Sequence, residues 1–462
     1  MLFCCFYYAY SQPLIEYNFL KRIINENNSI ELLPLKKYSP FEIIYNQKIY
    51  LNSNLPNLEN LNGIYIPKGY GVMTSALVNL NYNNLSLSVE PIINNYKEFP
   101  LNLPEKQKYF SVLNDVPLKE SYKNNLHRFI NTGIKYKNKH IALGYGNWNR
   151  WWGPGIHNSL VMSNNAQGFY HYFIGTNDYQ TIINNVQYKF EYILSNSIKN
   201  YSGVDFFNSL MNLNIRYNNL EFGFSTNVLS GGYNDISWGF KKAAQVIFTN
   251  ENMKYWDQLF DYYILYNNKS SGIMTYFEYA YPNRSYGDEN PEGYNYHSSS
   301  SIIGVRKYRA FNSKKIMFGL EYARLVQGIY YNILPTPNWY DNIKYNYSSY
   351  NNRRWGAHSG ADSDDLFVFI GFLGSKINFV YGINYERHGV TFHFPPEVKI
   401  ESKIHTSFKY KNTNFSLIFE NEYFEHYGFV DQNINVWTQT FEKGSIQRTH
   451  TLLFSIEHSM LK

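Results

Sequence analysis

The segment 144–176 carries the residues of this chain that are best suited to chemistry on a ligand. Within it, aromatic and hydrogen-bonding side chains follow at short spacing: Trp148, Arg150, Trp151, Trp152, Asn164 and Asn165. Indole rings stack on the apolar faces of sugar rings, while guanidinium and amide groups hydrogen-bond to hydroxyls. These six residues are therefore candidates for glycan binding.

The same segment has a second, structural interpretation. Pro154 stands between Gly153 and Gly155. Because glycine permits positive φ and proline fixes φ, the backbone must turn sharply here. Ser163 and the asparagine pair after it suit the satisfaction of backbone groups in turns. This chemistry favours an internal or plug-like loop near 150–170 over an open sugar platform.

Other reactive chemistry is not indicated. The sequence has no GxSxG motif, phosphate-binding loop or dinucleotide fingerprint, and its 36 acidic residues give no reason to choose one glycosidase pair. The 12 histidines form no HExxH motif and no close pair that would suggest zinc. Acidic clusters at 288–292 and 362–365 offer oxygen ligands for calcium, but they are predicted to be solvated surface loops. We expect no catalytic residue, no metal and no cofactor.

Composition narrows the class of protein. The 462 residues include 46 Tyr, 33 Phe and 8 Trp, and tyrosine suits strands and surfaces between apolar and aqueous surroundings. The net charge is +6, but the 42 basic residues are scattered, which argues against nucleic-acid binding. After its start the chain has no apolar run long enough for a spanning helix. This does not exclude a membrane barrel, because barrel strands alternate apolar and polar residues and contain no long apolar run.

The first residues resemble a secretion signal. Residues 1–10 are apolar and include both cysteines, and Ala9 and Ser11 place small residues before a cut at Gln12. A signal peptide over 1–11 is expected, although the usual basic leader is missing, as in a truncated start. The mature chain would then have no cysteine and no thiol chemistry. Helical spacing predicts a short helical segment over 12–35.

Most of the remaining chain alternates in the manner of β-strands. In residues 376–386, one face carries Ile377, Phe379, Tyr381, Ile383 and Tyr385, and the other carries Lys376, Asn378, Asn384 and Glu386. Similar two-faced segments, about 10 residues long, recur at 186–194, 220–224, 316–322 and 415–423. About 25 residues per strand and connection give about 18 strands. Weaker helical patterns lie at 119–130 and 239–248.

The polar face of these strands bears on the class. It carries Asn, Ser, Thr, Gly and Tyr with single charges, which suits a crowded polar lumen better than bulk water. A large β-sandwich or a propeller is the soluble alternative, but no 40-residue propeller repeat supports it.

Several sequence blocks carry a family resemblance and keep their order over most of the chain. They are YIPKGYG (65–71), SVEPII (88–93), NDVP (114–117), RWWGPGIHNSLVMSNNAQGF (150–169), FEYA (277–280), IIGVRKY (302–308), LEYA (320–323), NWYDN (338–342) and RRWGAHSGADSDDL (353–366). These blocks resemble the capsule assembly proteins called Wzi, in the version found in Bacteroidetes-type bacteria. Residues 361–365 depart from the usual Gly-Pro-Gly-Ser order of that family.

The resemblance implies an 18-stranded outer-membrane barrel with a small helical part on the periplasmic side, and a role in holding capsular polysaccharide. The hypothesis is an all-β, transmembrane, antiparallel β-barrel over 36–462, with a few short helices on the periplasmic side or in loops. It would be monomeric and non-enzymatic, in the outer membrane of a Gram-negative bacterium. Its expected partners are capsular or exopolysaccharide and outer-membrane lipid. The alternatives are a porin-like channel for small solutes and, less favoured, a barrel enzyme acting on glycan or lipid.

Overall fold

The structure is a computed structural model of the chain. It describes residues 40–57, 59–101, 127–200, 202–231, 257–283, 299–313, 315–326, 339–340, 343–351, 353–390, 395–428 and 445–461. The expected signal peptide (1–11), the helical segment (12–35) and the helix candidate at 239–248 lie outside these residues.

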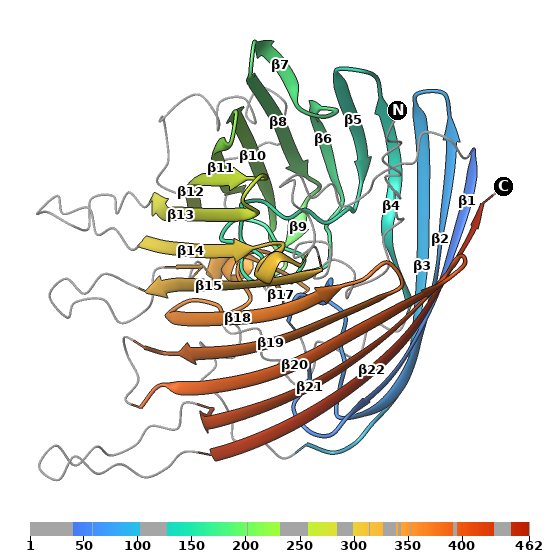
Figure 1. Ribbon diagram of the computed structural model, residues 1–462, viewed down its shortest axis with the longest axis vertical. Coiled ribbons are helices and arrows are strands. Elements are labelled where there is room, and N and C mark those ends of the chain that lie inside the picture. The colour runs from blue at the N-terminus through green and yellow to red at the C-terminus, as the bar shows by residue number, and fades with distance from the viewer. Residues whose placement is uncertain are drawn as a thin grey trace, which may run out of the picture.

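One antiparallel sheet of twenty strands dominates the fold, and eighteen of its strands form a continuous barrel wall (Figure 1). The first nine wall strands are β1 (Phe41–Asn52), β2 (Gly69–Tyr82), β3 (Leu85–Glu98), β4 (His127–Lys137), β5 (Ile141–Gly146), β6 (His171–Thr176), β8 (Val186–Ser195), β10 (Asp205–Tyr217) and β11 (Leu220–Gly231). The other nine are β12 (Asp257–Asn268), β13 (Ile273–Asn283), β14 (Ser299–Lys307), β15 (Ile316–Val326), β18 (Ser363–Leu373), β19 (Ile377–His388), β20 (Glu397–Tyr410), β21 (Thr413–Tyr427) and β22 (Ser445–Leu461).

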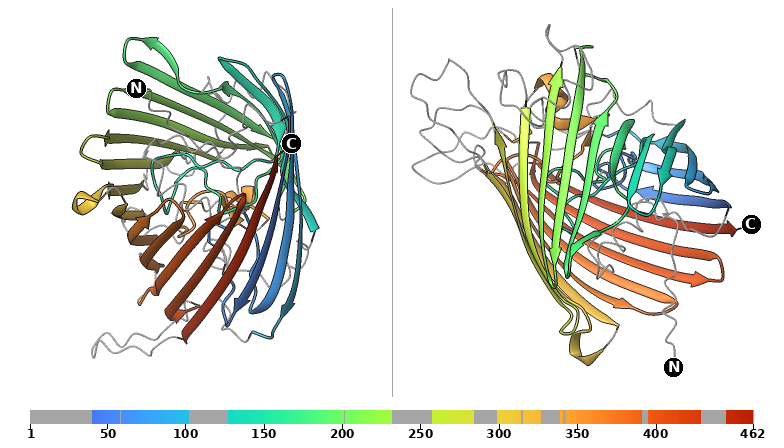
Figure 2. Two further views of the ribbon diagram at one scale, coloured as in Figure 1. Left: turned by 45° about the vertical axis from the view of Figure 1, so that its right-hand side comes forward. Right: turned by 90° about the horizontal axis from the view of Figure 1, so that it is seen from above.

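The wall closes because β1 pairs with β22 as well as with β2. The remaining sheet strands, β7 (Gln180–Ile183) and β9 (Ile198–Lys199), add short pieces to β8 and β10. A separate two-stranded ladder joins β16 (Ser349–Tyr350) to β17 (Arg353–Arg354). Two further views show the curved wall around an interior that contains chain (Figure 2). The prediction of a barrel of about 18 strands is confirmed.

The wall presents its apolar face outward and its polar face inward. On β19, Ile377 is 49% exposed and Ile383 is 44% exposed, whereas Asn384 and Glu386 are each 1% exposed. The alternation predicted over 376–386 is therefore correct in register and in direction. This arrangement is the reverse of that in a soluble protein, and it suits a barrel with lipid outside and a polar interior.

Glycines on the inner face accommodate aromatic rings from the neighbouring strand. Tyr276 stands opposite Gly304, and Tyr263 stands opposite Gly223. In both pairs the tyrosine ring lies so close to the glycine that a Cβ atom would overlap it. The rings thus lie flat against the wall, and their hydroxyls reach carboxylates on other wall strands, Glu321 on β15 and Glu221 on β11.

Connections alternate between short and long around the barrel. At one end, tight turns use asparagines with positive φ, such as Asn83, Asn185 and Asn218, which fits the turn preference of this residue. At the other end the connections are long, and those at 53–68, 147–170 and 327–362 contain buried residues. Bacterial barrels have short periplasmic turns and longer extracellular loops.

Helix is scarce in the described residues. It comprises two 3-10 segments, η2 (Ala310–Asn312) and η3 (Ile343–Ser348), both in connections. None of the described helices has the length and apolar character needed to cross a membrane.

Two local expectations are wrong. The helix expected over 119–130 is contradicted where the structure describes it, because β4 begins at His127, with Phe129 53% exposed and Ile130 4% exposed. The acidic residues at 362–365 are not solvated, since Asp362, Asp364 and Asp365 are all buried. The cluster at 288–292 lies outside the described residues.

Candidate functional site

Three segments from the long connections fill part of the lumen. We call residues 53–66, 147–170 and 343–362 the plug. Most described plug residues are buried, and the segment 147–170 runs through the barrel interior (Figure 1). The plug segments contact one another and the polar inner face of the wall.

The Gly-Pro-Gly turn sits against the wall. Gly153 has a φ of 91°, and a Cβ atom there would lie 2.5 Å from a carboxylate oxygen of Glu278. A Cβ atom at Gly155 would overlap the carbonyl oxygen of Asn158. Glycine is therefore required at both positions, which accounts for the Gly-Pro-Gly order recognised in the sequence.

A buried carboxylate of the wall holds the loop that follows this turn. Glu321 on β15 accepts backbone N–H groups from Ile156 at 2.5 Å, His157 at 3.1 Å and Asn158 at 2.7 Å. The hydroxyl of Tyr276 donates to the same carboxylate at 2.6 Å. Hydrogen bonds to a charged acceptor are stronger than neutral ones, so Glu321 is a principal anchor of the plug.

The three candidate tryptophans pack inside the barrel. Trp148 is 2% exposed and donates its indole N–H to Ser88 at 3.2 Å. Trp151 is 6% exposed and donates to the carbonyl of Gly155 at 2.8 Å, which braces the turn. Trp152, also 6% exposed, belongs to an apolar cluster that joins plug residues to side chains of the wall.

The asparagine pair joins the plug segments to one another. The side-chain amide of Asn164 donates to the carbonyl of Asn60 at 2.9 Å. Asn165 donates to the carbonyl of Arg354 at 3.1 Å and accepts the backbone N–H of Asn60 at 3.0 Å. Each asparagine thus satisfies backbone groups of another segment, as the structural interpretation of this motif requires.

Arg150 is the most accessible of the six candidates. Its guanidinium pairs with Glu191 on β8 at 2.8 Å, and 13% of its side chain is exposed. It also lies 5.3 Å from the ring centre of Phe173. The structure therefore brings all six candidates into one part of the lumen, where five of them are buried. Their role in glycan binding stays a prediction.

A buried ionic network lies where the plug meets β18, β19, β20 and β21. Lys399 pairs with Glu59 of the plug and lies 3.2 Å from Glu401 and 3.4 Å from Glu422. The network consists of the carboxylates Glu59, Asp365, Glu386, Glu397, Glu401, Glu420 and Glu422, the lysines Lys399 and Lys403, and the histidines His157, His358 and His388. The charge is mainly negative.

Two histidines of this network come from different plug segments. The rings of His157 and His358 lie edge to face at 4.5 Å, and His157 stacks on Phe367 at 4.3 Å. Burial lowers the pKa of His157 to about 3, so this side chain is neutral near pH 7. Burial also acts to lower the pKa of His358, but Asp365 and Glu386 outweigh it and raise that pKa.

The sequence alone did not reveal this histidine pair. His157 and His358 are about 200 positions apart, and the search for zinc motifs considers only local spacing. A weak signal was present, because each histidine follows a Trp-Gly pair, at Trp152-Gly153 and at Trp355-Gly356. Only the folding of both connections into one lumen brings them together.

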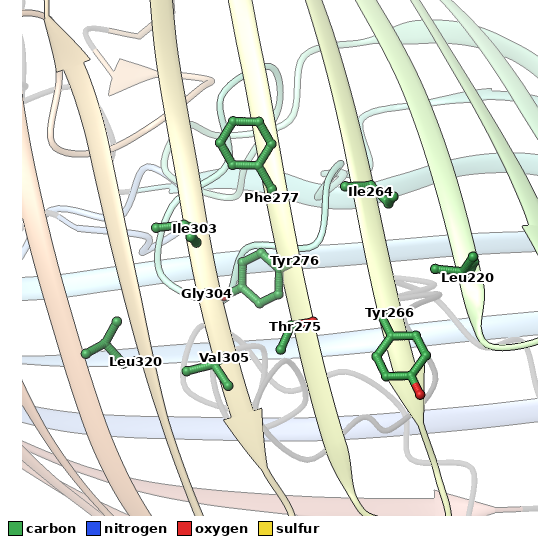
Figure 3. Close-up of a pocket in the computed structure, with 10 residues that line it drawn as sticks. All are labelled: Leu220, Ile264, Tyr266, Thr275, Tyr276, Phe277, Ile303, Gly304, Val305 and Leu320. Atoms are coloured by element: carbon green, nitrogen blue, oxygen red, sulfur yellow. The ribbon is translucent and has the colours of Figure 1, made fainter.

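The outer face carries a shallow apolar groove over β11 to β15 (Figure 3). Its lining includes Leu220, which is half-buried, and Ile264, Phe277, Ile303 and Leu320, which are all at least 37% exposed. These side chains belong to the outward apolar face described above. The groove is therefore part of the surface that meets lipid.

The fold is shared with known barrels. A solved structure of Wzi from Escherichia coli, described as a carbohydrate-binding β-barrel of the outer membrane involved in group 1 capsule assembly, covers 97% of this chain and 99% of its own, at a TM-score of 0.63 and 10% identity. Structures of OccAB4 from Acinetobacter baumannii and OccK1 from Pseudomonas aeruginosa each cover 92% of this chain, and 99% and 100% of their own. Both have a TM-score of 0.49, with 9% and 8% identity. No family model matches the chain, and no curated protein sequence does.

The chain has the fold of an outer-membrane barrel. Its apolar exterior, polar interior and closed antiparallel wall fit the outer membrane of a Gram-negative bacterium, where such barrels reside. The similarity to Wzi extends over nearly the whole barrel.

Proposed function

We propose that this protein is a non-enzymatic outer-membrane barrel that anchors or organises capsular or other surface polysaccharide. It would act as a monomer, with outer-membrane lipid around its apolar exterior. Support comes from the filled lumen, from the sequence blocks that resemble the Wzi family, and from the similarity in fold to a carbohydrate-binding barrel.

The filled lumen is the observation that carries the proposal. Solute passage requires a continuous aqueous path, whereas the plug segments here are buried and bonded to wall carboxylates. Displacing the loop around Asn158 would break several hydrogen bonds at Glu321 together. A porin-like channel, the main alternative, would need an aqueous path beside the plug or through the space that its displacement would open.

The enzyme alternative has less support. Among the described residues, the most concentrated set of titratable groups is the ionic network, and its members His358, Asp365 and Glu386 are each at most 4% exposed. A polysaccharide chain would not reach these groups without removal of the plug.

Gene deletion tests the proposed role. The proposal expects the deletion strain to shed polysaccharide into the medium, and the restored gene to return it to the cell surface. Unchanged retention of capsule in the deletion strain would refute the role. Large single-channel conductance of the purified wild-type protein would instead support the porin alternative.

The candidate residues require a separate binding test. Trp151→Ala and Trp152→Ala are compared with Tyr82→Ala, which removes an aromatic side chain that is 76% exposed at the short-turn end. Glycan pull-down and heat-modifiable migration on gels are measured for each protein. Loss of glycan binding with intact migration supports direct contact, and loss of both supports a role in the plug. Unchanged glycan binding removes these residues from the candidate set.

A further inference from the structure

Two overlapping sets of side chains around His358 have the spacing of metal ligands: His358 with Asp365 and Glu386, and His358 with His157 and Glu59. Nε2 of His358 lies 3.3 Å from Oδ2 of Asp365, and Nε2 of His157 lies 3.5 Å from the same oxygen. Carboxylate oxygens of Glu59 and Glu386 lie 3.7 Å and 4.0 Å from Nε2 of His358. Tetrahedral zinc with bonds of 2.0–2.1 Å places neighbouring ligand atoms about 3.3–3.4 Å apart.

Hydrogen bonding does not account for this spacing. Charge-assisted N–H···O bonds measure about 2.7–2.9 Å, and His388 in the same network meets Glu386 at 2.7 Å and Glu397 at 2.9 Å. By contrast, Nε2 of His157 and Nε2 of His358 are buried and have no hydrogen-bond partner among the described residues. Both nitrogens lie instead at ion-pair distance from one oxygen of Asp365.

The electrostatic environment favours a cation between these groups. The ionic network contains seven carboxylates and only two lysines. Burial of excess negative charge is costly unless a cation or protons compensate it. A divalent ion near His358 would neutralise part of that charge.

The surrounding side chains suit the orientation of these ligands. Asn158 donates to Asp365 at 2.8 Å, which fixes the carboxylate, and Phe367 stacks on the ring of His157. The amide of Asn60 lies 3.4 Å from Nδ1 of His358, and its oxygen has no hydrogen-bond partner among the described residues. The same amide nitrogen donates to the backbone carbonyl of His157 at 3.1 Å, so Asn60 contacts both histidines.

We propose that His358, Asp365 and Glu386, with His157 as the fourth ligand, bind a divalent transition-metal ion of the Zn²⁺ class. The two histidines belong to different plug segments, and Asp365 and Glu386 belong to wall strands β18 and β19. One ion would therefore cross-link the two segments and fasten both to the wall. This role goes beyond polysaccharide anchoring and is independent of it.

Metal binding to the purified full-length protein in detergent is the direct test. The protein is stripped with a chelator, incubated with ZnCl₂ and dialysed, and its zinc content is measured by mass spectrometry. The proposal expects one zinc per chain and a higher temperature for the heat-modified gel transition when zinc is present, because a ligand of the folded state stabilises it. Wild-type protein that keeps its folded migration but retains no zinc would overturn the proposal.

Substitutions locate the bound metal. His157→Ala and His358→Ala are each expected to weaken zinc binding at least about 100-fold, since even outer-shell changes cost 10–100-fold. The matched control is His171→Ala, which removes a buried histidine outside the network. Zinc binding that survives both ligand substitutions, or that falls equally in the control, would also overturn the assignment. Folded migration of each variant is verified before binding is compared.

Discussion

Substitution of Glu321 by glutamine tests whether the wall carboxylates hold the plug in place. One carboxylate oxygen accepts from the Ile156 N–H and the Tyr276 hydroxyl, and the other accepts from the N–H groups of His157 and Asn158. Glutamine replaces one oxygen by an NH₂ group, which cannot accept. Whichever way the amide is oriented, two of the four buried donors lose their acceptor.

The expected cost follows from those two donors. An unsatisfied buried donor costs about 1–3 kcal/mol, so the plugged state loses about 2–6 kcal/mol relative to a state in which the loop is released. Since about 1.4 kcal/mol corresponds to a tenfold change, the released population rises at least about 30-fold. The wall itself keeps its strand pairing, because the substitution leaves the backbone of β15 unchanged.

Single-channel recording in planar bilayers measures the released state. The wild-type protein is expected to stay closed, and Glu321→Gln is expected to show intermittent openings and faster protease cleavage within 147–170. The matched control is Glu221→Gln, because Glu221 is also buried and also accepts from a tyrosine that lies over a glycine, Tyr263. The hydrogen bonds of Glu221 to Tyr263 and Arg216 join wall strands only. If Glu321→Gln stays as closed and as protease-resistant as the control, the anchoring argument is wrong.

Three further predictions address a tyrosine that contacts the plug at Leu160, the wall and the exterior. Burial raises the pKa of Tyr340 to about 12. This group therefore contributes its whole stabilisation of the folded state below pH 10. The folded state loses that contribution, about 3 kcal/mol, as the pH rises from 10 to 12. Heat-modifiable migration across this range should fall in wild type and fall less in Tyr340→Phe, and equal alkaline loss in both would contradict the assignment. Gly304→Val should cost about 1–3 kcal/mol in urea unfolding, because the Tyr276 ring must move, and an unchanged midpoint would refute the close packing. Ile303→Arg places a charge on a side chain that is 53% exposed toward lipid and should cost about 2–4 kcal/mol in vesicles if it lies near the membrane centre. No loss of stability in vesicles would count against a lipid-facing exterior there.

The sequence predicted the wall well because its signal is local. Alternation on β19 gives both the strand and its direction, since Ile383 faces outward and Asn384 inward. The helix prediction for 119–130 was wrong where the structure describes this segment. Helical spacing placed Phe129 on a helix, whereas Phe129 and Ile130 alternate between the outer and inner faces of a strand. A short amphipathic segment fits both the helical and the strand period. Whether it forms a strand depends on pairing with neighbouring strands.

The candidate site was predictable only in its local part. The turn at Gly153 and the hydrogen-bonding use of Asn164 and Asn165 follow from residue types in one short stretch. The contact between His157 and His358 depends instead on two long connections entering the same lumen, and no local pattern reports that. The burial of Asp365 was missed for the same reason, because a run of acids resembles a solvated loop until the fold encloses it.

The closure of β1 against β22 has a consequence for how the molecule is assembled. Glu42 pairs in register with Leu461, so the two ends of the barrel sequence meet only when the last strand is present. Contacts between such distant residues form slowly, and before they form both terminal strands present unpaired edges. An assembly intermediate that lacks β22 would therefore be an open, curved sheet with two exposed edges, which would have to be protected from pairing with other chains until β22 arrives.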